Sequence, residues 1–229
     1  MDKYEIVKRI ETFAPPETAE DWDCSGWLVE TALSDVKKIM LALTVTDDVV
    51  IQAKEQNCDM IISHHPLFVV PVAYKDIDIY CAHTNMDKAQ GGTTDKLIET
   101  LGLPEGHHCG EFLRIVEHET TADEFTHKLL KLSSGLRYVN NQSVNQLKRI
   151  AFCGGSGSEF IQEAFENNCD ALVTGDIKFH TALESPIVLF DIGHFESEIS
   201  VLDVFKSLLP KEIEVIKAFE SSPFRQIKS

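Results

Sequence analysis

Residues 38–66, KIMLALTVTDDVVIQAKEQNCDMIISHHP, hold the pattern that decides the fold. Lys38 to Val45 is an apolar run typical of a buried strand, and Thr46 can cap a helix that extends to about Gln56. Asp59 to Ile62 is a second short apolar run, and it ends at two adjacent histidines. A strand, a helix and a second strand in this order predict a βαβ unit with parallel strands.

The same alternation extends in both directions along the chain. Tyr4 to Phe13 has apolar residues at helical spacing, and Ile77 to Ala82 has the character of a further strand. Thr121 and Glu124 form a capping box in front of an amphipathic helix, and from Arg149 onward strands and helices alternate again. We therefore predict an α/β fold with mainly parallel sheets flanked by helices.

An internal repeat is visible when the chain is shifted against itself by 111 residues. The Asn-Cys-Asp triplet at 57–59 then coincides with the same triplet at 168–170, and the strand and helix patterns of the two halves coincide around it. Both halves end a strand with a histidine that is followed four residues later by a carboxylate, His83 with Asp87 and His194 with Glu198. Two unrelated βαβ units, which resemble one another anyway, are the alternative explanation.

The repeat predicts two similar α/β lobes. We expect an N-terminal lobe over residues 1–103, a connecting α/β segment over 104–148, and a C-terminal lobe over 149–229. Related lobes that face each other across a pseudo-two-fold axis would bring the carboxyl ends of their strands together. Because α/β proteins place their sites at those strand ends, a site between the lobes is expected.

The composition limits the partners of the chain. It has 229 residues and a formal net charge of −16, which opposes binding to the phosphates of DNA. No stretch approaches the roughly 18 apolar residues that span a membrane. The N-terminal residues lack the basic-then-apolar pattern of a signal peptide. We expect a cytoplasmic protein that binds neither DNA nor a membrane.

His64 and His65 are unusual at the end of an apolar strand, where a buried core favours Val or Ile. A polar strand end that makes ordinary hydrogen bonds is one explanation. A metal site is the other, because imidazole is the commonest metal-ligating side chain and two buried histidines are costly to desolvate without partners. Neighbouring strand residues point to opposite faces, so both rings reach one site only if the chain leaves regular strand geometry. Pro66 favours such a departure.

A mixed set of imidazoles and carboxylates accompanies the pair. Asp87 and Glu198 each follow a histidine by four residues, so each shares a helical face with that histidine if a helix begins there. The candidate metal ligands are His64, His65, Asp87, His194 and Glu198. Five ligands exceed the need of one tetrahedral zinc and suit two divalent ions, which can be Zn, Mn, Fe, Co or Ni. As lone residues, the two acids would be ordinary solvated carboxylates.

Three further polar residues lie near the candidate ligands in sequence. His83 is expected to be structural or to support a ligand, with direct metal binding as the alternative. Asp176 and His180 are candidates for proton transfer close to the metals. The glycine-rich loop at 154–158 follows a strand; a tight turn is the favoured interpretation, and a phosphate cradle is the alternative, although the lysine of a P-loop is missing.

Six motifs together resemble one known family, the GTP cyclohydrolase 1 type 2 family, also called the NIF-three-like proteins. They are Trp22-Asp23-x-x-Gly26, Ile61-Ile62-Ser63-His64-His65-Pro66, His83-Thr84-Asn85-Met86-Asp87 with Gly91-Gly92, Cys153-Gly154-Gly155-Ser156-Gly157, Thr174-Gly175-Asp176-Ile177-Lys178-Phe179-His180 and Asp191-x-Gly193-His194-x-x-x-Glu198. They occur in family order from about residue 20 to 200. Cys24, Ser25 and Trp27 depart from the usual residues of the family near its cavity-facing loop, which bears on substrate preference.

The resemblance implies a two-lobed α/β fold with a dinuclear metal site between the lobes. By motif match, the ligands fall on His64, His65, Asp87, His194 and Glu198. Members of the family assemble as toroidal homohexamers whose sites face an internal cavity. The chain is similar to the short form, which lacks the domain that longer members insert between the halves.

Two functions follow from the resemblance. The first is a dinuclear metal-dependent hydrolase that acts on a nucleotide or related small molecule. The family name suggests opening of the guanine ring of GTP with loss of formate, in which an activated water attacks C8 of the purine. The second is a non-catalytic metal-binding ring that serves as a scaffold for a regulatory partner or a metabolite. Turnover separates the two.

Overall fold

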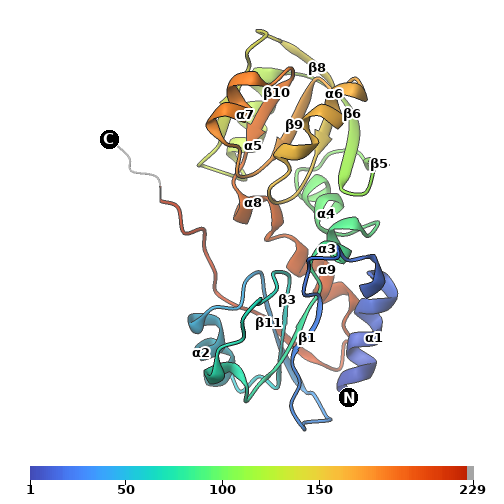
Figure 1. Cartoon of the computed structure of the whole chain (residues 1–229), viewed down its shortest axis with the longest axis vertical. Coiled ribbons are helices and arrows are strands. Elements are labelled where there is room, and N and C mark those ends of the chain that lie inside the picture. The colour runs from blue at the N-terminus through green and yellow to red at the C-terminus, as the bar shows by residue number, and fades with distance from the viewer. Residues whose placement is uncertain (226–229) are drawn as a thin grey trace. The chain divides into compact units, whose positions relative to one another are not determined.

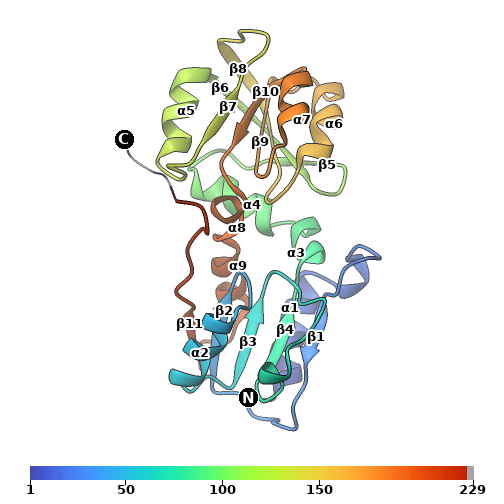
Figure 2. The ribbon, with the colours of Figure 1, turned by 60° about the vertical axis from the view of Figure 1, so that its left-hand side comes forward.

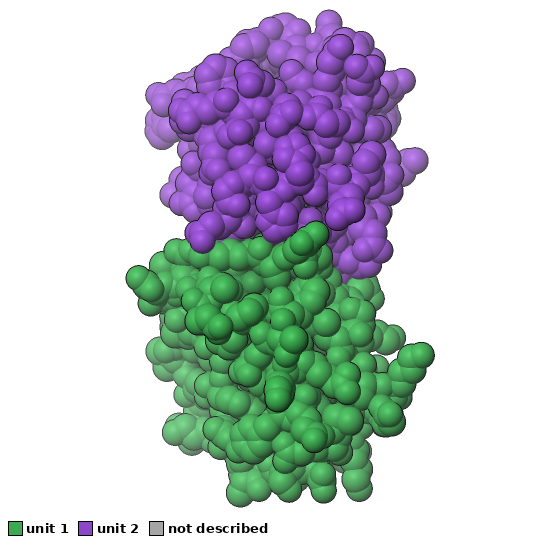
Figure 3. All heavy atoms as spheres, turned by 90° about the vertical axis from the view of Figure 1, so that its right-hand side faces the viewer, with its two compact units in different colours: residues 1–92, 201–221 green, residues 93–200, 222–229 purple. Residues whose placement is uncertain are grey.

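The computed structural model describes residues 1–225 and contains two compact units (Figure 3). Unit 1 comprises residues 1–92 and 201–221, and unit 2 comprises residues 93–200 together with the chain from residue 222 onward. These units are defined by which residues pack together. The segments 1–103, 104–148 and 149–229 were defined by the sequence repeat instead, and their bounds stay a prediction.

Unit 1 is built on a five-stranded sheet with the order β1-β4-β3-β2-β11 (Figures 1 and 2). Its strands are β1 Gly26–Val29, β2 Lys38–Ala42, β3 Met60–Ser63, β4 Asp78–Cys81 and β11 Glu214–Lys217. Four of them are parallel, and β1 runs antiparallel to β4 at one edge. The βαβ unit expected over residues 38–66 is therefore present as β2, α2 and β3.

Helices cover both faces of this sheet. The helices of unit 1 are α1 Lys3–Phe13, α2 Asp47–Glu55, α3 Thr84–Lys88 and α9 Val201–Leu208, with short 3-10 turns η1 Pro16–Thr18 and η2 Val72–Tyr74. The hydroxyl of Thr46 caps α2 by accepting from the N–H of Val49, as expected for an N-cap threonine. Met40 and Ile61 pack with the apolar residues of α2, while α1 and α9 lie on the other side of the sheet (Figure 1). Alternate strand residues therefore face different helices.

Unit 2 has a six-stranded sheet with the order β5-β6-β8-β9-β10-β7. Its strands are β5 His107–Cys109, β6 Leu113–Thr121, β7 Arg137–Val139, β8 Gln146–Phe152, β9 Ala171–Thr174 and β10 Val188–Asp191. The three central strands β8, β9 and β10 are parallel. The flanking pairs β5–β6, β6–β8 and β7–β10 are antiparallel, so the parallel core of unit 2 is extended on both sides.

The helices of unit 2 are α4 Thr93–Thr100, α5 Ala122–Leu130, α6 Ile161–Glu166, α7 Phe179–Glu184 and α8 His194–Glu198, with the 3-10 turn η3 Ser158–Phe160. α5 lies on one face of the sheet, and α6 and α7 lie on the other (Figure 2). Both halves of the expected capping box form between Thr121 and Glu124 at the start of α5. Phe125 packs in the core on one face and Ile161 in the core on the other. The α/β class expected from the sequence is confirmed.

Local geometry recurs at the 111-residue spacing. Asn57 and Asn168 both have positive φ angles, of 53° and 58°, at the turn after a helix. Asp59 accepts the backbone N–H groups of Lys37 and Lys38 at the start of β2, and Asp170 accepts those of Lys148 and Arg149 within β8, at 2.7–3.0 Å. These features agree with a repeated βαβ unit, whose common origin stays a prediction.

Candidate metal centre

The histidine pair of unit 1 lies just beyond the end of β3. This strand ends at Ser63. The N–H group of His64 donates to the carbonyl of Ala42 at 3.2 Å, and that of His65 donates to the carbonyl of Leu43 at 2.8 Å. The two imidazole rings are 5.2 Å apart between centroids. Both histidines therefore lie beyond the last residue of β3. This position matters because neighbouring residues of a regular strand point to opposite faces, so two adjacent rings can serve one site only outside regular strand geometry.

His64 is held in a fixed orientation. Its ring is fully buried, and Nδ1 lies 3.1 Å from the carbonyl oxygen of Ala82. Because a carbonyl only accepts, Nδ1 carries the proton, and the neutral ring then presents the lone pair of Nε2. That nitrogen lies 3.3 Å from Oδ1 of Asp87 in α3. An imidazole nitrogen and a carboxylate oxygen so directed match the donors of a divalent metal site.

A third imidazole belongs to the same cluster. His64, His65 and His83 each offer a ring nitrogen, and these three atoms lie within 4.8 Å of one another. Nδ1 of His65 lies 2.6 Å from the hydroxyl of Thr44, which follows β2. The cluster therefore collects side chains that follow three parallel strands, since His83 follows β4. Whether His83 supports a ligand or binds metal directly stays a prediction.

Asp23 is a supporting residue that the sequence did not single out. Its Oδ1 lies 3.0 Å from Nδ1 of His83, and its Oδ2 accepts from the hydroxyls of Ser25 and Thr84 at 2.8 and 2.6 Å. Burial raises the pKa of Asp23, but the hydrogen bonds from His83, Thr84 and Ser25 outweigh burial and lower the pKa below its usual range. An ionised carboxylate on Nδ1 directs Nε2 of His83 away from itself, as in carboxylate–histidine–metal arrangements. The only sequence signal was membership of a motif, Trp22-Asp23-x-x-Gly26.

Unit 2 forms its cluster within one turn of helix. His194 and Glu198 stand at the two ends of α8, and Nε2 of the histidine lies 3.0 Å from Oε2 of the glutamate. This is the i, i+4 geometry expected from their spacing. Oδ2 of Asp176 lies 2.7 Å from Nδ1 of the same ring. Asp176 thus touches the candidate ligand from the side opposite to Glu198.

Backbone geometry fixes this arrangement in unit 2. Asp176 has a φ of 57°, a left-handed conformation that is uncommon outside glycine and that clusters at functional sites. Asp191, at the end of β10, accepts from the N–H groups of Ile177 and Gly193 at 2.9 and 3.0 Å and also binds Arg137. One buried carboxylate therefore anchors both loops, the one that carries Asp176 and the one that leads into His194. The sequence showed Asp191 only as part of a motif.

The surroundings of His194 favour its protonated form. The hydrogen bond to Glu198 raises the pKa, burial opposes it, and the charges of Glu198 and Asp176 raise it further, to about 9. A bound metal ion requires the neutral ring, so metal and proton compete for His194.

The glycine-rich loop after β8 forms a tight turn. The N–H groups of Gly154, Gly155 and Gly157 donate to side-chain hydroxyls of Thr94, Ser197 and Thr174. These donors serve the turn, which supports the favoured interpretation over a phosphate cradle. Gly155 has a φ of +68°, and a Cβ on it would collide with the Glu198 carboxylate. This glycine leaves room for the candidate ligand.

His180 lies on α7, and its exposed ring contacts Phe179 with 5.3 Å between centroids. Asp176 touches His194, as described above. The roles of Asp176 and His180 in proton transfer stay a prediction.

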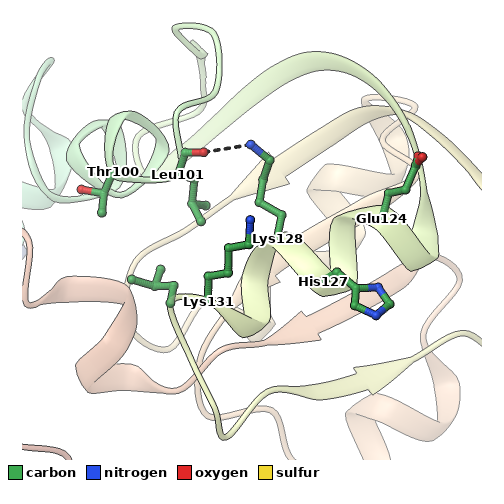
Figure 4. A pocket seen from close by; sticks show the side chains of 7 residues that line it. Thr100, Leu101, Glu124, His127, Lys128 and Lys131 are labelled. Carbon is green, nitrogen blue, oxygen red and sulfur yellow. Dashed lines mark hydrogen bonds between the residues drawn. The ribbon is translucent and has the colours of Figure 1, made fainter.

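A hollow of about 540 Å³ lies between the end of α4 and α5 in unit 2 (Figure 4). Its walls include Leu101, Lys128 and Lys131. The ammonium group of Lys128 donates a hydrogen bond of 3.0 Å to the carbonyl of Leu101. A lysine that satisfies a terminal helix carbonyl stabilises the helix end. We assign a structural role to this hollow.

The clusters define a class of protein. Each unit of this α/β chain carries imidazole nitrogens and carboxylate oxygens at the carboxyl ends of its parallel strands, with hydrogen bonds that orient the rings. This donor chemistry fits divalent transition metals, so the chain is a candidate metal-binding α/β protein.

The family follows from comparison with known proteins. The profile of Duf34/NIF3 (NGG1p interacting factor 3) matches residues 1–223, and the chain belongs to this family. The resemblance inferred from the motifs is thereby confirmed.

Individual relatives support the assignment to this family. A GTP cyclohydrolase 1 type 2 homolog of Clostridium perfringens is 32% identical over 99% of this chain and 100% of its own length. Reduced HcgD from Methanocaldococcus jannaschii has a TM-score of 0.83 and 27% identity, over 95% of this chain and 97% of its own. A Bacillus cereus protein related to NIF3 has a TM-score of 0.84 at 20% identity, over 99% of both chains, and shows the shared fold.

Proposed function

We propose that this chain is a metal-dependent hydrolase that acts on a nucleotide or related small molecule through two divalent ions. The proposed ligands are His64, His65, Asp87, His194 and Glu198. One observation carries the proposal, namely that each unit directs an imidazole Nε2 at a carboxylate oxygen. The pairs are His64 with Asp87 at 3.3 Å and His194 with Glu198 at 3.0 Å. The proposal requires the clusters of the two units to act together.

The donor set supports the proposal of two ions and is compatible with several transition metals. Three imidazoles and two carboxylates exceed one tetrahedral shell, and they suit two ions with positions left for water and substrate. Zn, Mn, Fe, Co and Ni all accept this mixture of nitrogen and oxygen donors. Bound ions of this kind lower the pKa of water and polarise the group under attack.

The protein's own residues orient the ligands. The carbonyl of Ala82 holds the Nδ1 proton of His64, and Asp176 holds that of His194, so in both rings Nε2 is the atom left for the ion. Asp176 and His180 are the proposed proton-transfer groups, with Asp176 the better placed through its contact with His194. After ring attack, such a group would deliver a proton to the departing fragment.

The substrate is proposed from the relatives. The Clostridium perfringens relative is called a GTP cyclohydrolase 1 type 2 homolog, which points to opening of the guanine ring of GTP with release of formate. One water adds at C8 and opens the imidazole ring to a formamide, and a second water hydrolyses the formamide to formic acid and an amine, so the reaction needs no oxidant or reductant.

Metal content and formate release test the proposal. Protein purified without chelator should hold close to two divalent ions per chain by elemental analysis, and with Zn or Mn it should release formate from GTP. His65→Ala should abolish the release while the oligomer persists. Full metal content with no turnover on a broad nucleotide panel would contradict the hydrolase and would favour a non-catalytic scaffold.

Assembly and location complete the proposal. We propose a homohexameric ring in the cytoplasm. Exposed apolar side chains support self-association, with Phe68, Val69 and Val72 in unit 1 and Phe179 and Leu183 in unit 2 at exposures of 63–82%. Within the part of the chain that the structure describes, helices are too short or too polar to cross a bilayer. Light scattering of the metal-loaded protein should give six chains.

A further inference from the structure

A cavity of about 400 Å³ in unit 2 borders the ring of His194. This volume lies within the range of small-molecule sites. Asp176, Gly193 and Glu196 also line it, together with the loop at 133–135 after α5 and the chain segment at 222–225. It is thus a pocket of ligand size, and one of its wall residues is a candidate metal ligand.

Ser133 in this wall has an unmet hydrogen-bond capacity. The residue is only 1% exposed, yet its hydroxyl has no hydrogen-bond partner among residues 1–225. Buried polar groups are nearly always satisfied, so an orphaned hydroxyl beside a cavity points to a ligand or an ordered water there.

Glu196 contributes a carboxylate to the same cavity, and its hydrogen-bond acceptors are also unused in the part of the chain that the structure describes. No hydrogen bond or ion pair engages it within the described chain, and the residue is partly buried. The carboxylate lies against Gly193, where a Cβ would collide with it, so the glycine makes room for this side chain. An ionised carboxylate only accepts hydrogen bonds, and it binds best to a pair of adjacent N–H donors.

Phe224 supplies an apolar surface to the same cavity. Its ring is 82% exposed and lines the pocket from the C-terminal segment. An exposed aromatic face beside a polar cavity suits stacking on a flat ring.

We propose that this cavity binds the guanine base of the substrate, with Glu196 accepting from N1–H and the 2-amino group while Phe224 stacks on the ring. The proposal rests on the proposed nucleotide hydrolase and specifies its substrate class. Guanine presents adjacent N1–H and 2-amino donors, whereas adenine presents an acceptor at N1. Because C8 lies on the opposite side of the purine from N1 and the 2-amino group, a base held by Glu196 keeps C8 clear of that carboxylate.

Calorimetry with nucleosides on the metal-loaded protein tests the base specificity without phosphate contacts. Guanosine should bind more tightly than inosine, which lacks the 2-amino group, and adenosine should bind most weakly, roughly 100-fold below guanosine. Adenosine binding as tight as guanosine, or no guanosine binding, would overturn the proposal.

Two variants with matched controls assign the residues. Glu196→Gln should weaken guanosine roughly tenfold or more and remove most of the preference over adenosine, whereas Glu184→Gln on α7 should change neither. Phe224→Ala should weaken guanosine and inosine alike, roughly tenfold, while Phe219→Ala, an exposed phenylalanine of unit 1, should have no effect. Metal content is measured in each variant, and unchanged nucleoside affinities in both pocket variants would refute the assignment.

Failure of this inference can be told apart from failure of the hydrolase. Formate release from GTP with unaltered KM in Glu196→Gln and Phe224→Ala overturns the pocket and leaves the hydrolase. Guanosine binding that depends on Glu196, without formate release from GTP, supports the pocket and removes the hydrolase.

Discussion

The two ligand clusters differ in how the chain brings their residues together. In unit 1, Thr44, His65 and His83 follow three different parallel strands, so the cluster exists only when the sheet has formed. In unit 2, His194 and Glu198 belong to a single helical turn. The first cluster is a product of tertiary structure, and the second is largely a product of local geometry.

Burial separates the clusters further. The side chains of His64 and of Asp23, which supports His83, are fully buried, whereas those of His194 and Asp176 are 35% and 48% exposed. A buried histidine with a fixed ring orientation is preorganised for an ion. In unit 2 the ligand Glu198 is buried as well, while His194 and its partner Asp176 are partly exposed. Unit 1 thus supplies a histidine in a fixed, buried setting, and unit 2 supplies a histidine whose protonation responds to solvent conditions.

Loss of a ligand should have the largest effect, and it should be larger in unit 1. His64→Ala should lower metal affinity by more than roughly 100-fold, because removal of a supporting partner alone costs roughly 10- to 100-fold. His194→Ala should also lower metal affinity. Thermal stability should fall only in His64→Ala, because that substitution leaves a cavity at a buried site. Competition with a chelator measures affinity, and His127→Ala on the exposed face of α5 is the control. Wild-type metal content in His64→Ala would remove this residue from the ligand set.

Loss of a supporting carboxylate should follow in size. Asp23→Asn should reduce metal affinity roughly 10- to 100-fold and lower the free energy of unfolding by about 2 kcal/mol, since buried charge-assisted hydrogen bonds are lost. Asp176→Asn should reduce affinity but leave unfolding nearly unchanged, because its carboxylate is half exposed. Chemical denaturation of the metal-free variants measures the difference. Equal destabilisation by both substitutions would show that burial does not distinguish the clusters.

Metal binding should depend on pH through His194. In the metal-free protein its pKa is raised to about 9, so below that pH an ion must displace a proton. Affinity should therefore rise about tenfold per pH unit from pH 7 and level off above 9. The same raised pKa stabilises the metal-free fold below pH 6.5, and this contribution is lost as the pH rises through 9. Calorimetry in two buffers should detect about one proton released per chain at pH 7.5; release that persists at pH 10 would assign the proton elsewhere.

The smallest effect should come from the glycine beside Glu198. Gly155→Ala should lower metal affinity several-fold because the new methyl group displaces the carboxylate, and positive φ should cost about 1 kcal/mol of stability. Gly102→Ala is the matched control, since it has a φ of +64° and open space around it. The control should lose the same stability and keep its metal affinity. If both variants bind metal alike, Gly155 has no part in the position of Glu198.

Much of the fold was predictable because its signals are local. The βαβ unit at 38–66 and the capping box at Thr121 depend on the spacing of residues close in sequence, and both formed as predicted. The contact of His194 with Glu198 has the same origin. The antiparallel strands β5 and β6 at one edge of unit 2 were not specified, because edge pairing depends on which segments meet after folding.

The sequence by itself determined the chemistry of this protein, since it showed which imidazoles and carboxylates follow strands and at what spacing. Only the tertiary structure decided which residues hold those ligands in place. Asp23 lies sixty residues from His83 in sequence, and the anchor Asp191 lies fourteen residues from Ile177. The physical reason is that hydrogen-bond direction and burial are properties of segments that meet in space, whereas periodicity and capping are properties of neighbours along the chain.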